Sequence, residues 1–88
     1  MESREVKILN KYGIHARPAA MFVKTAAKFR SNITVEKEEM QVNGKSIMGL
    51  LTIEGHHGAL LIIKADGPDA VEALDELEAL IKQKFNEE

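Results

Sequence analysis

Two short segments of this 88-residue chain carry side chains that could do chemistry, and the first reads GIHARP over residues 13–18. Pro18 is typical of the first turn of a helix, because proline lacks the N–H that such a turn leaves unpaired. His15 is therefore predicted to lie at the start of a helix, where free backbone N–H groups favour an anion. The helix dipole also disfavours an imidazolium, so we expect a neutral imidazole whose lone pair can act as a nucleophile.

Arg17 supplies the group that a phosphoryl product on His15 would need. A guanidinium forms strong, charge-assisted hydrogen bonds with phosphate oxygens. The alternative is a surface histidine that merely caps the helix, which is the commoner role of a histidine at a helix end. Arg17 and Pro18 strengthen the chemical interpretation of His15, but they do not exclude this alternative. No Asp or Glu lies between Gly13 and Lys28. Neither a serine-protease-like triad nor a paired-carboxylate site is therefore indicated around His15.

The second segment reads KSIMGL over residues 45–50. Ser46 is predicted to cap a short helix whose core side holds Ile47, Leu50 and Leu51. Met48 falls off this stripe, so we expect it to be exposed, either as a polarizable partner contact or as a stray apolar surface residue. Phosphorylation of Ser46 would place nearly two negative charges beside Met48 and could repel an acidic partner.

Composition excludes several other classes of function. Twelve Lys and Arg residues against fourteen Asp and Glu residues give a net charge of −2, and no basic stripe alternates with aromatics, so nucleic-acid binding is not indicated. The absence of cysteine excludes disulfide scaffolds and thiolate-bound zinc. The neighbours His56 and His57 are poorly spaced to hold one ion, so we expect no metal site.

No apolar run is long enough for membrane insertion or for a signal segment, so we expect a cytoplasmic protein. The chain length predicts one domain over residues 1–88.

The elements that must position these segments follow from hydrophobic periodicity. Alternating or apolar runs predict strands over residues 6–8, 33–35, 40–42 and 59–65. Apolar residues at offsets of three and four predict helices over residues 16–29, 47–53 and 71–85, the last begun by a capping box of Asp69 and Glu72. The order β-α-β-β-α-β-α favours an α+β fold with helices on one side of a mainly antiparallel sheet.

Together these segments resemble the HPr family, the histidine-containing phosphocarrier proteins of the bacterial phosphoenolpyruvate-dependent phosphotransferase system. The resemblance covers nearly the whole chain. Residues 13–19 look like the active-centre motif of the family, and residues 45–50 look like its regulatory-serine motif. The resemblance implies an open-faced β-sandwich, in which three helices cover one face of a four-stranded antiparallel sheet.

The resemblance also implies a function. His15 would accept a phosphoryl group on Nδ1 from phosphorylated enzyme I and pass it to an enzyme IIA for sugar uptake, while Arg17 neutralises phosphoryl oxygens. The protein would then be a monomeric carrier rather than an enzyme, and it would need no cofactor. Ser46 would match the serine that HPr kinase/phosphorylase modifies, in a form that acts with a regulator of carbon catabolite repression. The surface that docks enzyme I and enzyme IIA would include Ile14, Ile47, Met48 and Leu51.

Three positions depart from the family pattern, and two alternatives stay open. Tyr12 replaces a residue that is often small and hydroxyl-bearing, Ala20 lies where the helix start of the family is often Ala-rich or contains Thr, and Glu54 replaces a frequent glycine after the second helix. A nitrogen-related phosphocarrier shares the histidine motif, and an HPr-like binding module could act through Ser46 alone. The intact segment 45–49 favours HPr, and the presence of His15 counts against the module. An independent enzyme with His15 as general base lacks an orienting carboxylate.

Overall fold

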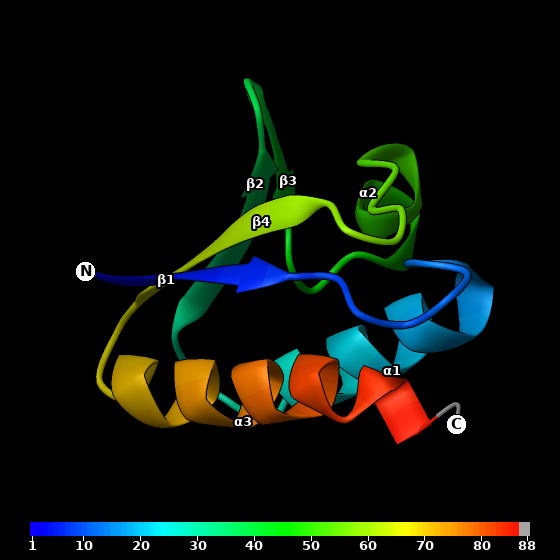
Figure 1. Cartoon of the computed structure of the whole chain (residues 1–88). Helices are drawn as coiled ribbons and strands as arrows, with labels where there is room; N and C mark the ends of the chain where they lie inside the picture. Colours follow the sequence, from blue (N-terminus) through cyan, green and yellow to red (C-terminus); the bar gives the residue numbers. More distant parts are fainter. Residues whose placement is uncertain (87–88) are drawn as a thin grey trace.

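The computed structural model describes residues 1–86 and shows a four-stranded antiparallel sheet with helices against one face (Figure 1). The strands lie in the order β1-β4-β2-β3. In chain order the elements are β1 (Glu2–Lys7), α1 (Ala16–Ala26), β2 (Asn32–Lys37), β3 (Met40–Asn43), α2 (Ile47–Thr52), β4 (Leu60–Asp66) and α3 (Ala70–Lys82), followed by a short turn, η1 (Lys84–Asn86). This arrangement confirms the predicted α+β fold with an open-faced antiparallel sheet and three α-helices. Within residues 1–86, no helix is long and apolar enough to cross a membrane.

The alternation of side chains along the strands explains why one face is covered. Ile33 and Val35 of β2 are buried beneath the helices, together with alternate residues of β4. The residues between them face the open side, where Lys64 Nζ lies 2.9 Å from Glu36 Oε1. β4 is buried at every second position and lies between β1 and β2, so the apolar run that predicted a central strand was interpreted correctly.

The two longer helices pack side by side on the covered face (Figure 1). Each buries a stripe, which comprises Pro18, Ala19, Phe22 and Ala26 in α1 and Ala70, Ala73, Leu74, Leu77 and Ile81 in α3. Both helices are shorter than predicted. The apolar spacing continues to Phe29 and Phe85, but these side chains pack from the turns that follow the helices.

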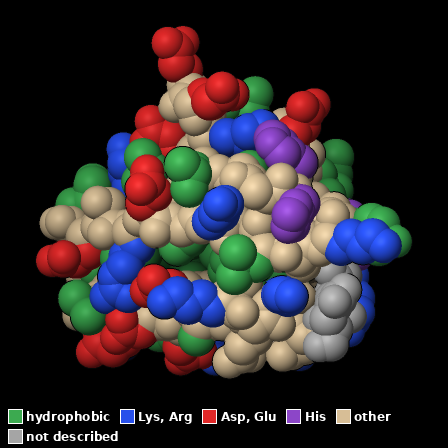
Figure 2. Space-filling view, viewed as in Figure 1, with side chains coloured by type: hydrophobic (Ala, Val, Ile, Leu, Met, Phe, Trp, Pro, Cys, Tyr) green, Lys and Arg blue, Asp and Glu red, His purple; other side chains and the backbone are tan. Residues whose placement is uncertain are grey.

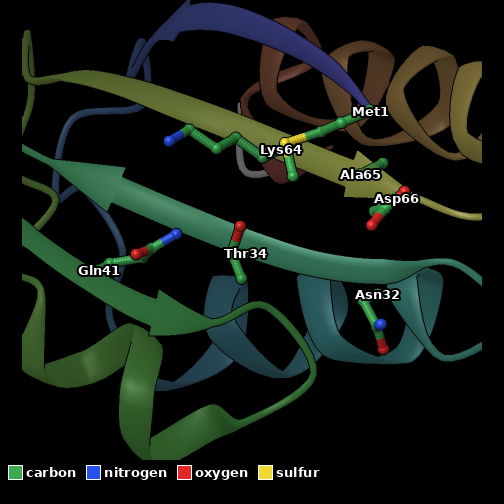
Figure 3. A pocket seen from close by; sticks show the side chains of 7 residues that line it. All are labelled: Met1, Asn32, Thr34, Gln41, Lys64, Ala65 and Asp66. Carbon is green, nitrogen blue, oxygen red and sulfur yellow. The ribbon is translucent and has the colours of Figure 1, made fainter.

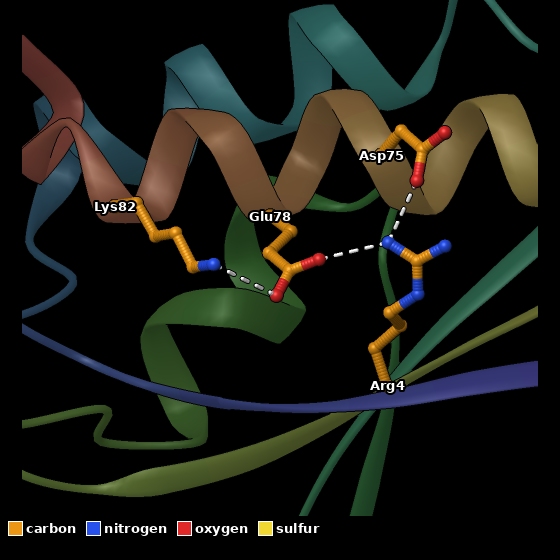
Figure 4. Close-up of polar contacts among 4 residues, drawn as sticks. All are labelled: Arg4, Asp75, Glu78 and Lys82. Atoms are coloured by element: carbon orange, nitrogen blue, oxygen red, sulfur yellow. Dashed lines mark hydrogen bonds and ion pairs between the residues drawn. The ribbon is translucent and has the colours of Figure 1, made fainter.

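β1 also differs from its predicted extent, because tertiary pairing rather than local alternation sets its start. It pairs with β4 from Glu2 onward, whereas the alternating pattern predicted a strand over residues 6–8. On the covered side, Arg4 Nη1 lies 2.7 Å from Asp75 Oδ1 and 2.8 Å from Glu78 Oε1 of α3 (Figure 4). The hydrogen bond from Arg4 is the main cause that lowers the pKa of Glu78. This edge strand is therefore tied to α3 as well as to the sheet.

The carboxylate of Asp69 does not cap α3, so the predicted capping box is wrong. Its Oδ1 accepts hydrogen bonds from the Ser31 hydroxyl at 2.6 Å and the Ser31 backbone N–H at 3.0 Å, and its Oδ2 accepts one from the Arg30 N–H at 2.9 Å. The capping prediction failed because these donors come from the connection between α1 and β2, far away in sequence. Asp69 joins this connection to the start of α3.

Candidate functional site

A tight turn at residues 10–13 connects β1 to α1 and fixes the backbone before His15. The buried Asn10 side chain donates from Nδ2 to the Gly13 carbonyl at 2.6 Å, and the Gly13 N–H donates to the Asn10 carbonyl at 3.2 Å. Gly13 has a φ of +69°, and a Cβ at this position would lie 2.3 Å from the Gly55 carbonyl oxygen. Glycine is therefore required at position 13 for both its conformation and its close backbone contact.

Ile14 locks the same turn onto the loop before β4. Its N–H donates to the Gly55 carbonyl at 2.7 Å, and its side chain covers Gly55, where a Cβ would lie 2.9 Å from Ile14 Cδ1. Ile14 is only 8% exposed. Its side chain therefore packs with the core, and its part in a docking surface stays a prediction.

His15 occupies the N-cap position of α1, with an extended backbone at φ −102° and ψ −168°. Its carbonyl accepts the Ala19 N–H at 2.9 Å, but its imidazole does not cap the helix. The imidazole therefore does not cap α1 through a hydrogen bond, and its chemical role stays a prediction. Arg17 is exposed in the first turn of this helix, and that turn, which lies wholly within the described residues, holds no acidic side chain. The helix start thus combines a half-buried imidazole with an exposed guanidinium.

A contact between Tyr12 and His15 was not predicted from the sequence. The two rings meet edge to face, with centroids 6.5 Å apart and an interplanar angle of 79°. Lys11 Nζ lies 5.3 Å from the centroid of the Tyr12 ring. Tyr12 itself is 73% exposed. Its position three residues before His15, across a glycine turn, is the one signal in the sequence that could have predicted this contact.

Ser46 caps α2 as predicted. Its Oγ accepts the Gly49 N–H at 3.1 Å, while the neighbouring Lys45 Nζ donates to the Phe29 carbonyl at 2.8 Å and so attaches the helix start to the turn that follows α1. Met48 is exposed, as its position off the apolar stripe predicted.

The apolar stripe of α2 is narrower than predicted. Leu50 is fully buried and Leu51 is half-buried, but Ile47 is 40% exposed, which corrects its assignment to the core side. The exposed apolar surface of α2 therefore comprises Ile47 and Met48, with Leu51 beside them. α1 and α2 pack against each other at the end of the molecule that holds the turn at residues 10–13 (Figure 1). Histidine side chains also lie at this end (Figure 2).

Glu54 follows α2 in the left-handed conformation, with a φ of +57°. Its carbonyl accepts the His56 N–H at 2.9 Å and Lys37 Nζ at 3.0 Å. A hollow of about 250 Å³ lies on one side of the turn at residues 10–13, and it is lined by Tyr12, Ile14, Glu54, Gly55 and His56. A non-glycine residue thus holds a left-handed backbone next to the site.

A second hollow, of about 190 Å³, lies on the open face of the sheet at a distance from these segments (Figure 3). It is lined by Met1, Asn32, Thr34, Gln41, Lys64, Ala65 and Asp66. None of the predicted site residues lines it. Within residues 1–86, no three His, Cys, Asp or Glu side chains cluster in a way that could hold a metal ion.

The expectation of a monomer finds no support among similar structures. A solved HPr of Thermoanaerobacter tengcongensis is a dimer; it is 47% identical, with a TM-score of 0.78 over 97% of this chain and 98% of that one. A solved Crh of Bacillus subtilis, a catabolite-repression protein, is a swapped dimer; it is 39% identical, with a TM-score of 0.77 over 96% of this chain and 97% of that one. The oligomeric state therefore does not follow from the fold.

Comparison with known proteins identifies the family. Residues 2–83 match the family model for the HPr component phosphorylation site of the phosphotransferase system. The phosphocarrier protein HPr of Treponema pallidum is 42% identical over 88 residues, which is the full length of both chains. A crystal structure of HPr from Thermoanaerobacter tengcongensis is 48% identical and superposes with a TM-score of 0.96 over 100% of this chain and 99% of that one. The two segments around His15 and Ser46, the observed fold and these matches agree, and the chain belongs to the HPr family of phosphocarrier proteins.

Proposed function

We propose that this protein carries phosphoryl groups on His15 from enzyme I to an enzyme IIA of the phosphotransferase system. The observation that carries the proposal is the position of the His15 imidazole, which lies at the N-cap of α1 without capping it. Arg17 follows in the first turn. A nucleophile, an anion-stabilising helix start and a cation are thus combined in three consecutive residues.

The transfer needs one bond to form and one to break. The lone pair of a neutral imidazole nitrogen attacks the phosphorus, and the bond from phosphorus to its donor atom on enzyme I breaks with its electron pair left on the donor. The family resemblance implies that Nδ1 of His15 is the attacking atom. Arg17 and the backbone N–H groups of the first turn of α1 stabilise the phosphoryl oxygens in both transition state and product. The second transfer, to enzyme IIA, repeats these steps in the reverse sense.

The exposure of the site suits a carrier better than an enzyme. A carrier must hold its phosphoryl group strongly enough to keep it and weakly enough to release it. His15 is half-buried and Arg17 is exposed, so the phosphoryl group would stay accessible to a second partner. A deep cationic pocket would instead retain it. The exposed apolar surface of Ile47, Met48 and Leu51 suits transient docking, since short-lived complexes have small interfaces.

Ser46 supports a second, regulatory function. Its side chain caps α2 beside the exposed Met48, at the end of the molecule that holds the turn at residues 10–13. A phosphate there would add nearly two negative charges to the docking surface and would repel an acidic partner. A kinase that modifies HPr and a regulator of catabolite repression are the partners that this function would require. The similarity to Crh of Bacillus subtilis, whose solved structure is described as that of a catabolite-repression protein, favours this possibility.

The test of the carrier function uses labelled phosphoenolpyruvate with enzyme I and Mg²⁺. Wild-type protein should gain label that is lost in acid and kept in base, as expected for a phosphohistidine. His15→Ala should gain none, while Ser46→Ala should be labelled like wild type. Failure to label the wild type, or full labelling of His15→Ala, would refute the carrier function.

A further inference from the structure

We propose that Tyr12 is a positioning residue for phosphoryl transfer, because its ring restricts the rotation of the His15 imidazole. The inference rests on the proposed role of His15 and assigns a function to a residue at which the chain departs from its family. It is drawn from the ring contact between the two side chains and from the rigidity of the turn that carries Tyr12.

The turn at residues 10–13 has little freedom to move. The buried Asn10 holds the Gly13 carbonyl at 2.6 Å, and the backbone of Gly13 lies so close to Gly55 that no Cβ could be accommodated. The next residue, Ile14, donates to the same Gly55 carbonyl at 2.7 Å. Tyr12 therefore projects from a backbone that is held on both sides, and its ring can act as a fixed wall.

The contacts of the Tyr12 ring point to the site rather than to the core. The ring is 73% exposed, so its burial contributes little to folding. It meets the His15 ring edge to face at 6.5 Å and 79°, within the range that aromatic pairs prefer. Lys11 Nζ, 5.3 Å from the ring centroid, adds a cation–π contact that favours this ring orientation.

Restricting the imidazole favours the transfer step more than docking. A histidine side chain at a helix start can rotate about two bonds, and only some orientations direct a ring nitrogen at an incoming phosphoryl group. A wall beside the ring removes part of this freedom before the partner binds, so less of it is lost in the transition state. Loss of the wall should therefore lower kcat for transfer while KM for the partner changes little.

The test compares Tyr12→Phe with Tyr12→Leu. Phenylalanine keeps the ring edge, whereas leucine keeps an apolar side chain of moderate size without the ring. With phosphorylated enzyme I as donor, Tyr12→Phe should retain the wild-type kcat, and Tyr12→Leu should lower it about three- to tenfold, in line with the strength of an aromatic pair. Val71→Ala removes part of an exposed apolar side chain on α3 and is the control that should leave kcat unchanged.

A spectroscopic measurement tests the contact between the two rings in the unphosphorylated protein. The carbon-bound protons of the His15 ring should keep their NMR chemical shifts in Tyr12→Phe and move in Tyr12→Leu, because the ring current is lost. An unchanged kcat in Tyr12→Leu, a change in KM alone, or equal defects in both variants would overturn the inference while the labelled wild type still supports the carrier function. A wild type that gains no label would overturn both.

Discussion

The Ser31 hydroxyl donates a 2.6 Å hydrogen bond to the Asp69 carboxylate, across 38 positions of sequence. Together with bonds from the backbone N–H groups of Arg30 and Ser31, it lowers the pKa of Asp69 below its ordinary value of 3.8, with the Ser31 hydroxyl as the largest cause. A carboxyl group whose pKa falls on folding stabilises the protein above its unfolded-state pKa. This contribution is lost as the pH falls through the lower, folded-state pKa.

Asp69→Asn should therefore lower the stability at neutral pH and reduce its decline in acid. The amide cannot accept the three hydrogen bonds as a carboxylate does, and it has no proton to gain between neutral pH and strong acid. Urea unfolding midpoints measured from neutral pH to well below pH 3.8 would check this prediction. Glu72→Gln, an exposed carboxylate on the same helix, is the matched control. Parallel pH profiles for Asp69→Asn and wild type would contradict it.

Glu54→Gly should stabilise the protein. Glu54 has a φ of +57° directly after the C-cap of α2, where glycine adopts the left-handed conformation without strain from a side chain. The expected gain is about 0.5–1 kcal/mol, which corresponds to a rise in Tm of about 2–8 °C for a domain of this size. Glu54→Ala removes the carboxylate but keeps the strain, so it should not give this gain. A Tm that rises equally in both variants would assign the effect to charge instead.

Arg17→Ala should slow phosphorylation of His15 without preventing it. The exposed guanidinium is expected to stabilise phosphoryl oxygens, and a hydrogen bond to a charged group contributes roughly 1.5–3 kcal/mol. The initial rate of transfer from phosphorylated enzyme I should fall about tenfold or more. Arg17→Lys keeps the charge but not the paired donors, so its transfer rate should lie between those of wild type and Arg17→Ala. A rate for Arg17→Ala equal to that of wild type would exclude this role.

Ser46→Asp should slow transfer from enzyme I, whereas Ser46→Asn should not. Both residues are good N-caps, so α2 keeps the hydrogen bond that Ser46 Oγ now accepts from Gly49. The two variants differ in one negative charge beside Met48, and a charge effect at an exposed surface weakens with salt. Transfer rates at several ionic strengths should therefore converge at high salt. A defect in Ser46→Asp that persists unchanged at high salt would refute the electrostatic account.

Local features of the site could be predicted from the sequence. Ser46 was predicted as an N-cap and Met48 as exposed, because both depend on residues within one turn of α2. The start of α1 after His15 followed from Pro18 in the same way. The order of the elements also followed from periodicity, and the structure confirms it.

Features that depend on distant partners could not be predicted. Ile14 is buried because the loop at Gly55 covers it, and nothing within the segment 13–18 indicates that loop. The Asp69 carboxylate binds the backbone of residues 30–31 rather than its own helix for a similar reason. The contact of Tyr12 with His15 was missed because a departure from a family pattern does not reveal which side chain the new residue contacts.

The position of β4 between β1 and β2 sets an order of events during synthesis of the chain. β1 pairs with β4, and the backbone of Ile14 binds Gly55, so the site at His15 depends on segments made much later. A ribosome that adds about 5–20 residues per second needs roughly three to ten seconds to proceed from residue 15 to residue 66. During that interval a nascent chain already contains the histidine but lacks its support. The backbone support of the proposed phosphorylation site is therefore completed late, in a step coupled to completion of the sheet.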